Sequence, residues 1–437
     1  MLFPMSWSYD AGSRERTNLC FKESVVNPML FPGDPQFSYE ALRSLGHIAY
    51  GGADFGEVAS TAGRITEGDY DSWHDEWLVT ADRVAGEAET SLAAGHLVSA
   101  RDGLLRASNY YRSAEFFLHG VPCDPRHMHA YDRSVECFQA AAALFTPKIE
   151  PVRIPFEGTT LPGYLYRADS SGTPRPTLIM STGFDGTAEE LHFMGALAAV
   201  ERGYTVLTFE GPGQPGPLHR EQLVFRPDWE NVITPVVDFA ETLPEVDNSQ
   251  ITLLGISMSG LLAPRAAAYE HRLAALIAID GVYDLGEVSI RGIPGSREEA
   301  ERRLRADSDP ELDALLEQMM SANPTMRWGV HHGMYVMGVD TPRAFGTAYL
   351  DYTLRGGTAE RIQCPTLVCD AEDEMFFEGQ AKELYDHLTC PKTFLRFTTA
   401  EGAGHHCQPG AQRILSARVF DWLDATLEER AVGGTGA

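Results

Sequence analysis

The sequence contains no run of about 20 apolar residues, the length that an α-helix needs to cross a membrane. Its first ten residues, MLFPMSWSYD, lack the basic segment followed by an apolar run that marks a secretory signal. Both absences argue against a membrane protein and against a secreted one. We therefore expect a soluble, cytoplasmic protein without a membrane partner.

Positive charge is also scarce. Lys and Arg number 35 against 62 Asp and Glu, which gives a formal net charge of −27 at pH 7. A chain of this charge repels the phosphates of nucleic acids and the surfaces of anionic membranes. We therefore expect no nucleic-acid partner.

Signatures of metal, nucleotide and disulfide sites are lacking as well. The cysteines are odd in number and dispersed, and none forms a CxxC pair, so neither a disulfide framework nor a zinc ribbon is predicted. There is no HExxH or GK[ST] motif, and the glycine-rich run 209–216 does not match GxGxxG. We predict no metal and no cofactor. The cysteines are Cys20, Cys123, Cys137, Cys364, Cys369, Cys390 and Cys407.

What the sequence does have is an ordinary globular composition, with 43% hydrophobic and 22% charged residues in a chain of 437. This length suits two domains. Residues 37–144 show helical periodicity, and Pro147 and Pro151 follow them, so we predict an N-terminal helical cap domain over 1–147. One apolar stripe of this region comprises Leu104, Ala107, Tyr111, Ala114 and Leu118.

Beyond residue 147, short apolar segments alternate with glycine turns and helical patterns, among them 189–202 and 261–270. This alternation is typical of an α/β fold, a mostly parallel sheet covered by helices on both faces. We predict a catalytic domain over 148–430, with a helical insertion over 286–358 that is too long for an ordinary connection, and a disordered tail over 431–437. The predicted strands cover 152–156, 163–166, 177–180, 205–209, 251–254, 275–279, 366–369 and 393–397.

The strongest chemical signal is a serine at a strand-turn-helix junction, in the run ITLLGISMSG that ends at Gly260. Small residues around Ser257 allow a sharp turn that lifts the hydroxyl above the sheet, as in a nucleophile elbow. The position two residues after the serine is Ser259 where such turns usually have glycine, and serine is small enough for it. We predict that Ser257 is a nucleophile.

A serine nucleophile needs a histidine base, and the base needs an acid that orients it. In this fold the order along the chain is serine, acid, histidine. The loop after strand 366–369 offers Asp373 and Glu374, and we leave the choice between these two carboxylates open. The loop after strand 393–397 offers His405 and His406, of which we favour His406 as the base.

The remaining element is an oxyanion hole. A backbone amide from the loop after strand 177–180 joins the amide that follows the nucleophile in such sites. We predict the amides of Phe184 and Met258, with Gly183 allowing close approach of the substrate. Asp185 either orients the substrate or caps a helix that begins near Thr187.

Together with the helical region, these motifs resemble the α/β-hydrolases that carry an N-terminal helical domain, over nearly the whole chain. That group includes the fungal heptaketide hydrolases of pigment biosynthesis and is related to 2,6-dihydroxypseudooxynicotine hydrolase. Departures from its pattern are Ser259 in place of glycine, and Glu210 and Glu374 where aspartate is common. The resemblance rests on GFDGTAEELHF, GYTVLTFEGPGQPG, FRPDWENVITPVVDF, the serine turn, DAEDEMFFEGQ, EGAGHHCQ, SWHDEWLVTADRV and SARDGLLRASNYYRSAEFF.

The resemblance implies a hydrolase that uses Ser257, the Asp373/Glu374 position and His406 to cleave a carbon–carbon bond next to a ketone. The substrate it implies is a polyketide-like or aromatic 1,3-diketone, enclosed between the helical domain and the sheet. The same triad would also serve an esterase, thioesterase or acyl-peptide hydrolase, and a cyclase or binding protein is a further alternative. We expect a small-molecule substrate, and the helical domain is a candidate surface for a homodimer.

Overall fold

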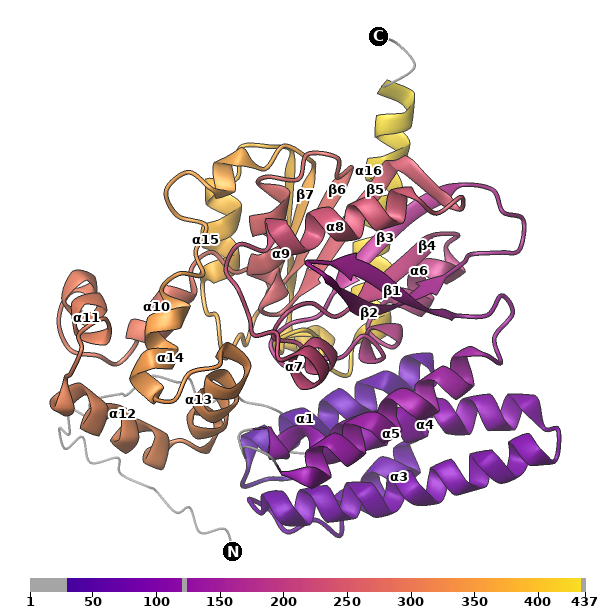
Figure 1. Cartoon of the computed structure of the whole chain (residues 1–437), viewed down its shortest axis with the longest axis horizontal. Helices are drawn as coiled ribbons and strands as arrows, with labels where there is room; N and C mark the ends of the chain where they lie inside the picture. The colour runs from indigo at the N-terminus through magenta and orange to yellow at the C-terminus, as the bar shows by residue number, and fades with distance from the viewer. Residues whose placement is uncertain (1–29, 120–123, 434–437) are drawn as a thin grey trace, which may run out of the picture.

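The computed structural model describes residues 30–119 and 124–433, and Cys20 and Cys123 lie outside these ranges (Figure 1). The N-terminal part of the described chain is helical. Asp34, Asp69 and Asp124 each accept hydrogen bonds from amides in the first turn of a helix, as N-cap residues do. The helices are α1 (Pro35–Gly46), α2 (Phe55–Ala62), α3 (Tyr70–Ala93), α4 (Leu97–Glu115) and α5 (Pro125–Ala142), with 3₁₀ turns η1 (His47–Tyr50) and η2 (Phe116–Leu118).

The second part of the described chain forms an eight-stranded sheet in the order β1-β2-β4-β3-β5-β6-β7-β8. The β1/β2 and β2/β4 pairs are antiparallel and the remaining pairs are parallel, which confirms the predicted α/β architecture. The strands are β1 (Glu150–Phe156), β2 (Thr159–Tyr166), β3 (Arg175–Ser181), β4 (Thr205–Phe209), β5 (Val246–Ile256), β6 (Ala275–Ile279), β7 (Thr366–Ala371) and β8 (Lys392–Phe397).

Helices cover both faces of this sheet, with α8 and α9 in front and α16 behind in Figure 1. A helix expected within 189–202 is broken into η3 and α6, because Gly195 between them adopts a φ of 143° that other residues rarely adopt. The elements are η3 (Glu190–His192), α6 (Ala196–Glu201), α7 (Pro215–Glu221), α8 (Glu230–Glu241), α9 (Ser259–Ala267), α15 (Gln380–His387), η5 (Thr399–Glu401) and α16 (Gln412–Gly433).

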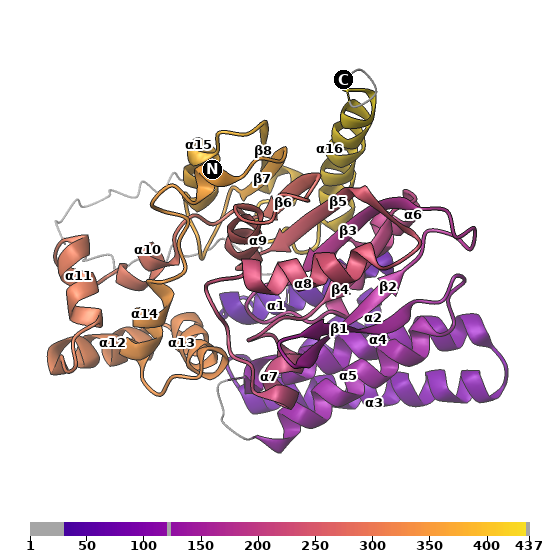
Figure 2. The same cartoon turned by 45° about the horizontal axis from the view of Figure 1, so that its top comes forward.

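Between β6 and β7 the chain leaves the sheet and forms the helical insertion, which lies to the left in Figures 1 and 2. The helices α10–α14 follow Asp284, Ser296, Asp309, Asn323 and Thr341, whose side chains each accept a hydrogen bond from a first-turn amide. They are α10 (Leu285–Ile290), α11 (Arg297–Leu304), α12 (Pro310–Ala322), α13 (Pro324–Met337) and α14 (Pro342–Tyr349), and the 3₁₀ turn η4 (Ala359–Arg361) follows before β7.

The C-terminal helix α16 continues through residues 431–433, which belong to the tail predicted to be disordered. Residues 434–437 of that predicted tail lie outside the described residues. Within the described ranges, no helix combines the length and the apolar character needed to span a membrane.

The N-terminal helices and the sheet share one hydrophobic core. It joins Trp73 and Tyr110 of the helical region to Met180, Val206 and Ile277 of β3, β4 and β6. The opposite face of the sheet packs against α8, α9 and part of the insertion in a second core. The sheet is therefore buried on both faces, and its strand ends face the N-terminal helices and the insertion.

Candidate active site

Ser257 stands in the sharp turn between β5 and α9, where its backbone adopts a φ of 60°. Two glycines make this turn possible. A Cβ at Gly255 would lie 2.1 Å from the carbonyl oxygen of Ser259, and a Cβ at Gly260 would lie 2.3 Å from that of Asp280. The local sequence therefore produces the strained, half-buried serine of a nucleophile elbow.

Ser259, the departure from the glycine pattern, has a structural use. Its hydroxyl donates a hydrogen bond to the carbonyl of Thr182 at 2.5 Å and lies 3.1 Å from the hydroxyl of Ser181. Both partners belong to β3 or the loop that follows it. The hydroxyl of Ser259 therefore ties the serine turn to the predicted oxyanion loop, which a glycine could not do.

The structure brings Ser257, His406 and Glu374 together in one chain of hydrogen bonds. Nε2 of His406 lies 2.9 Å from Oγ of Ser257, and its Nδ1 lies 2.7 Å from Oε2 of Glu374. The second oxygen of Glu374 accepts the amides of Phe376 and Phe377 at 2.7 and 3.1 Å. These two amides therefore orient the carboxylate of Glu374 so that its other oxygen faces the imidazole.

The neighbouring candidates face elsewhere. The carboxylate of Asp373 accepts a hydrogen bond from the hydroxyl of Thr399 at 2.5 Å. The backbones of Asp373 and His405 form an isolated parallel bridge, which aligns the acid loop with the histidine loop. Burial lowers the pKa of His405 below its usual range, and its Nδ1 makes no hydrogen bond within the described chain.

Sequence reasoning missed a second carboxylate at the histidine. Asp280 directly follows β6, adopts a φ of 53° and is 2% exposed. Its Oδ2 lies 3.2 Å from Nδ1 of His406 and accepts the amide of Cys407, while Oδ1 accepts the side-chain amide of Gln408 at 3.0 Å. The signal was an aspartate directly after the buried strand 275–279, where the carboxyl ends of neighbouring strands meet.

These carboxylates determine the electrostatics of His406. Burial lowers the pKa of its imidazole, but electrostatic contacts with Cys407 and Glu374 and the hydrogen bond to Asp280 raise it well above its usual range. Burial also raises the pKa of the Cys407 thiol to about 12, so this thiol is neutral near pH 7. Near neutral pH the two carboxylates therefore raise the pKa of His406.

The predicted oxyanion residues lie on either side of the nucleophile. Met258 follows Ser257 at the start of α9, and a Cβ at Gly183 would lie 2.8 Å from that of Ser257. Gln214 holds the loop by donating to the carbonyls of Thr182 and Gly183 at 2.5 and 3.2 Å. Within the described residues, the amides of Phe184 and Met258 make no hydrogen bond, so both are free to donate.

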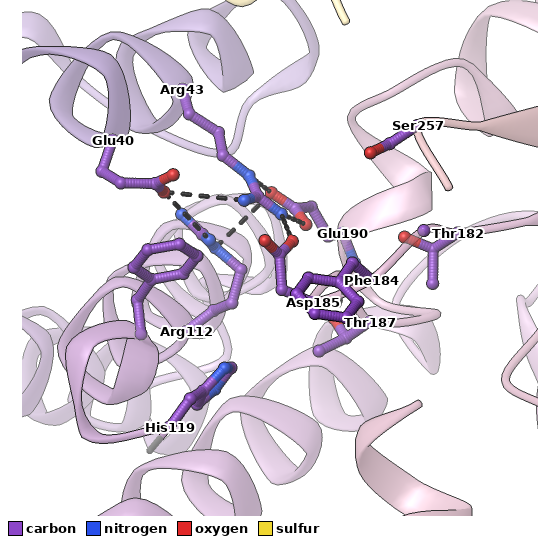
Figure 3. A network of polar contacts seen from close by, with 12 residues as sticks. Glu40, Arg43, Arg112, His119, Thr182, Phe184, Asp185, Thr187, Glu190 and Ser257 are labelled. Atoms are coloured by element: carbon purple, nitrogen blue, oxygen red, sulfur yellow. Dashed lines mark hydrogen bonds and ion pairs between the residues drawn. The ribbon is translucent and has the colours of Figure 1, made fainter. Parts of the chain in front are cut away.

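Asp185, predicted to bind substrate or to cap a helix, is ion-paired with the N-terminal region. Arg43 of α1 donates to Asp185 at 3.1 Å and makes two bonds to Glu190 at 2.7 and 2.6 Å (Figure 3). Burial raises the pKa of Glu40 beside this network to about 7. Arg112 adds a further ion pair to Glu190 at 3.5 Å. The helical domain thus holds the loop that carries Phe184.

A cavity of about 200 Å³ opens at Ser257 and His406. Glu40 and Arg43 of α1 and Asp185 contribute charged side chains to its wall. The rest of its wall is mostly apolar and comes largely from the insertion. That wall includes Leu316, Met319, Met320, Met326, Phe345 and Tyr349.

Two groups of buried side chains in the described chain have the composition of a metal site. The first, Asp280, His406 and Cys407, includes the histidine that meets Ser257, and its thiol is neutral, whereas metals bind the thiolate. The second group is Glu115, His119 and His127, which lies between the N-terminal helices.

The sheet, the serine turn and the histidine that meets it define an α/β-hydrolase. The model of the α/β-hydrolase family matches residues 178–413, and the chain belongs to that family. It is a hydrolytic enzyme. The match begins within β3 and ends within α16, so it spans every segment that carries a predicted site residue.

Relatives that match over most of the chain are fungal hydrolases. The 20-hydroxy-prefusarin hydrolase FUS2 of Gibberella moniliformis is 35% identical over 404 residues, 89% of this chain and 96% of the relative. Hydrolase acrC of Aspergillus aculeatus is 35% identical over 424 residues, 91% of this chain and 98% of the relative. The crystal structure of 2,6-dihydroxy-pseudo-oxynicotine hydrolase matches with a TM-score of 0.66 and 25% identity, over 86% of this chain and 94% of that one. The resemblance inferred from the motifs is thereby confirmed.

Proposed function

We propose that this protein is a serine hydrolase that cleaves a carbon–carbon bond next to a ketone in a polyketide-like or aromatic 1,3-diketone. The observation that carries the proposal is the chain from Ser257 Oγ to His406 Nε2 at 2.9 Å and from His406 Nδ1 to Glu374 at 2.7 Å. In this proposal Glu374, rather than Asp373, is the acid of the triad.

The reaction begins when Nε2 of His406 takes the proton of Ser257 and Oγ attacks the carbonyl carbon. The amides of Phe184 and Met258 donate to the resulting alkoxide. Glu374 accepts a hydrogen bond from Nδ1–H of His406 throughout, which keeps Nε2 directed at the serine and stabilises the imidazolium.

Collapse of the alkoxide breaks the carbon–carbon bond, and its electron pair leaves as an enolate that the second carbonyl of the substrate stabilises. His406 returns its proton to this enolate. A water molecule, deprotonated by His406, then attacks the acyl-serine, and the carboxylic acid product leaves with Ser257 restored. No cofactor takes part in this sequence.

The cavity supports an apolar substrate with one polar end. Flexible methionines and aromatic rings from the insertion surround most of it, whereas Arg43 and Asp185 lie near the oxyanion loop. The name of the relative FUS2 gives its substrate as 20-hydroxy-prefusarin, which supports a natural-product substrate for this chain also. We further propose that the enzyme acts in the cytoplasm, and that any homodimer uses the helical domain.

The test compares two substrates that share one aryl-acyl group, a 1,3-diketone and the matching activated ester. We expect a higher kcat/KM for the diketone and no turnover by Ser257→Ala. If the ester is preferred by orders of magnitude, the enzyme is an esterase with the same triad. If a folded sample of Ser257→Ala retains full activity, the triad itself is wrong.

A further inference from the structure

A second cluster of titratable side chains lies away from the nucleophile, where the N-terminal helices meet α7 and α13. We call it the histidine cluster. Ring centroids of His119 and His127 lie 4.6 Å apart, those of His127 and His219 also 4.6 Å, and those of His119 and His332 4.7 Å. Glu115, in the last turn of α4, completes it.

The carboxylate of Glu115 is the centre of this cluster. Its Oε2 lies 2.7 Å from Nε2 of His119 and 2.6 Å from Nε2 of His127, and its side chain is 1% exposed. In the part of the chain that the structure describes, no arginine or lysine pairs with it. An ionised carboxylate at this depth needs a compensating positive charge.

The nitrogen atoms around Glu115 are left with unused bonding capacity. Nε2 of His127 is 2.6 Å from the carboxylate, yet the contact is not aligned as a hydrogen bond. Nε2 of His219 is buried and has no hydrogen-bond partner within the described residues. Its other nitrogen, Nδ1, lies 2.7 Å from the hydroxyl of Tyr335. An imidazole with one nitrogen held by a hydrogen bond and the other free is typical of a metal ligand.

We propose that Glu115, His119 and His127 bind a zinc ion, with His219 as the fourth ligand. One carboxylate and imidazole nitrogens form a donor set that zinc accepts in tetrahedral geometry. The three ligand atoms of Glu115, His119 and His127 already lie within 4.8 Å of one another, whereas His219 lies outside this group and its imidazole must approach on binding. Zn–N bonds of about 2.0–2.1 Å require neighbouring ligand atoms roughly 3.3 Å apart, so the contacts to Glu115, now 2.7 and 2.6 Å, open by roughly 0.6–0.7 Å on binding.

The charge of the cluster suits this ion. The ion would supply the positive charge that the buried carboxylate of Glu115 lacks. It would also join α4 and α5 to α7, and hence the helical domain to the catalytic domain. His332, stacked on His119, contacts the carbonyl of Phe184 at 2.9 Å, which connects this junction to the oxyanion loop.

The experiment measures zinc on the untagged full-length protein after chelator treatment, dialysis and reloading with one equivalent of Zn²⁺. We expect about one zinc ion per chain after gel filtration, and an intense visible d–d spectrum of four-coordinate geometry when Co²⁺ replaces zinc. The double variant His119→Gln/His127→Gln should retain no zinc. His96→Gln, an exposed histidine at the start of α4, is the matched control and should bind as the wild type does.

The proposal fails if the wild type retains no more zinc than the double variant. His219→Gln should weaken zinc binding at least tenfold, and unchanged binding would remove His219 from the ligand set. If the double variant does not fold, the Co²⁺ spectrum of the wild type decides, because a six-coordinate or absent spectrum contradicts the site. None of these results depends on the triad.

Discussion

At the scale of single residues, the histidine loop presents one imidazole to two carboxylates. Oε2 of Glu374 lies 2.7 Å from Nδ1 of His406, and Oδ2 of Asp280 lies 3.2 Å from the same nitrogen. Losing the acid of a triad costs about 10⁴-fold in kcat when nothing replaces it. Because Asp280 remains in contact with Nδ1, we expect Glu374→Gln to lose only roughly 10²-fold.

We expect Asp280→Asn alone to lose roughly tenfold, and the double variant to lose more than the product of the single losses, since residues that contact a common partner are coupled. Steady-state kinetics of the four proteins in this cycle measure the coupling. Equal activities of Glu374→Gln and the double variant would show that Asp280 takes no part.

The pH dependence of kcat/KM tests the effect of the same two carboxylates on His406. His406 must be neutral at Nε2 to accept the serine proton, and burial, which lowers its pKa, is outweighed by nearby negative charge. We therefore expect kcat/KM to rise with pH through a midpoint above 6.5, the ordinary pKa of histidine. Removing one negative charge, in Glu374→Gln or Asp280→Asn, lowers the pKa of His406 and should move the midpoint to lower pH. An unchanged midpoint in both variants would contradict this assignment.

The limits of sequence reasoning are clearest at Asp373 and Glu374. The pattern located both carboxylates in the right loop, but successive side chains in an extended loop point in opposite directions, and the sequence does not say which one faces the histidine. The amides of Phe376 and Phe377 orient Glu374, and Thr399 orients Asp373. These contacts depend on how the loop folds back, which no local pattern expresses.

At the scale of elements, helix α1 is joined to the oxyanion loop by Arg43. Its guanidinium makes two bonds to Glu190 and one to Asp185, with only 11% of the side chain exposed. Removing one partner of a buried ion pair leaves an uncompensated charge, which costs about 3–5 kcal/mol. Because Arg112 still lies 3.5 Å from Glu190, we expect Arg43→Met to destabilise the protein by about 3 kcal/mol.

Urea denaturation measures this loss. The matched control is Arg83→Met on α3, whose arginine is 49% exposed and pairs with Glu57 and Glu87. Exposed ion pairs contribute little, so this control should change the free energy of unfolding by less than about 1 kcal/mol. Equal effects of the two substitutions would show that Arg43 contributes no more than a surface charge.

Strands were easier to predict than helices. All the predicted strand segments fall within or overlap β1–β8, because buried parallel strands are short, apolar and bounded by glycine turns. The expected helix 189–202 is interrupted at Gly195, which adopts a φ of 143° where the side chains of Met180 and Phe420 lie beside it. Such tertiary contacts leave no periodic signal in the sequence.

At the scale of the whole molecule, the N-terminal helices and the sheet share one hydrophobic core. Their shared core places Trp73 and Trp77 with Met180 and Ile277. We therefore expect one cooperative unfolding transition, with tryptophan fluorescence and far-ultraviolet circular dichroism changing at the same urea concentration. Two separated transitions would show that the helical domain folds independently.

The insertion differs from the rest of the molecule in having a small core of its own, formed by Ile293, Ala300, Leu304, Leu312, Leu316 and Leu350. Leu304 and Leu316 belong both to this core and to the cavity wall. Substitutions in α11 and α12 can therefore reshape the cavity while the serine turn and the shared core stay intact. We therefore expect one catalytic apparatus to accept a different metabolite when this insertion changes, so a chimera that exchanges α11 and α12 between relatives should inherit the donor's substrate preference.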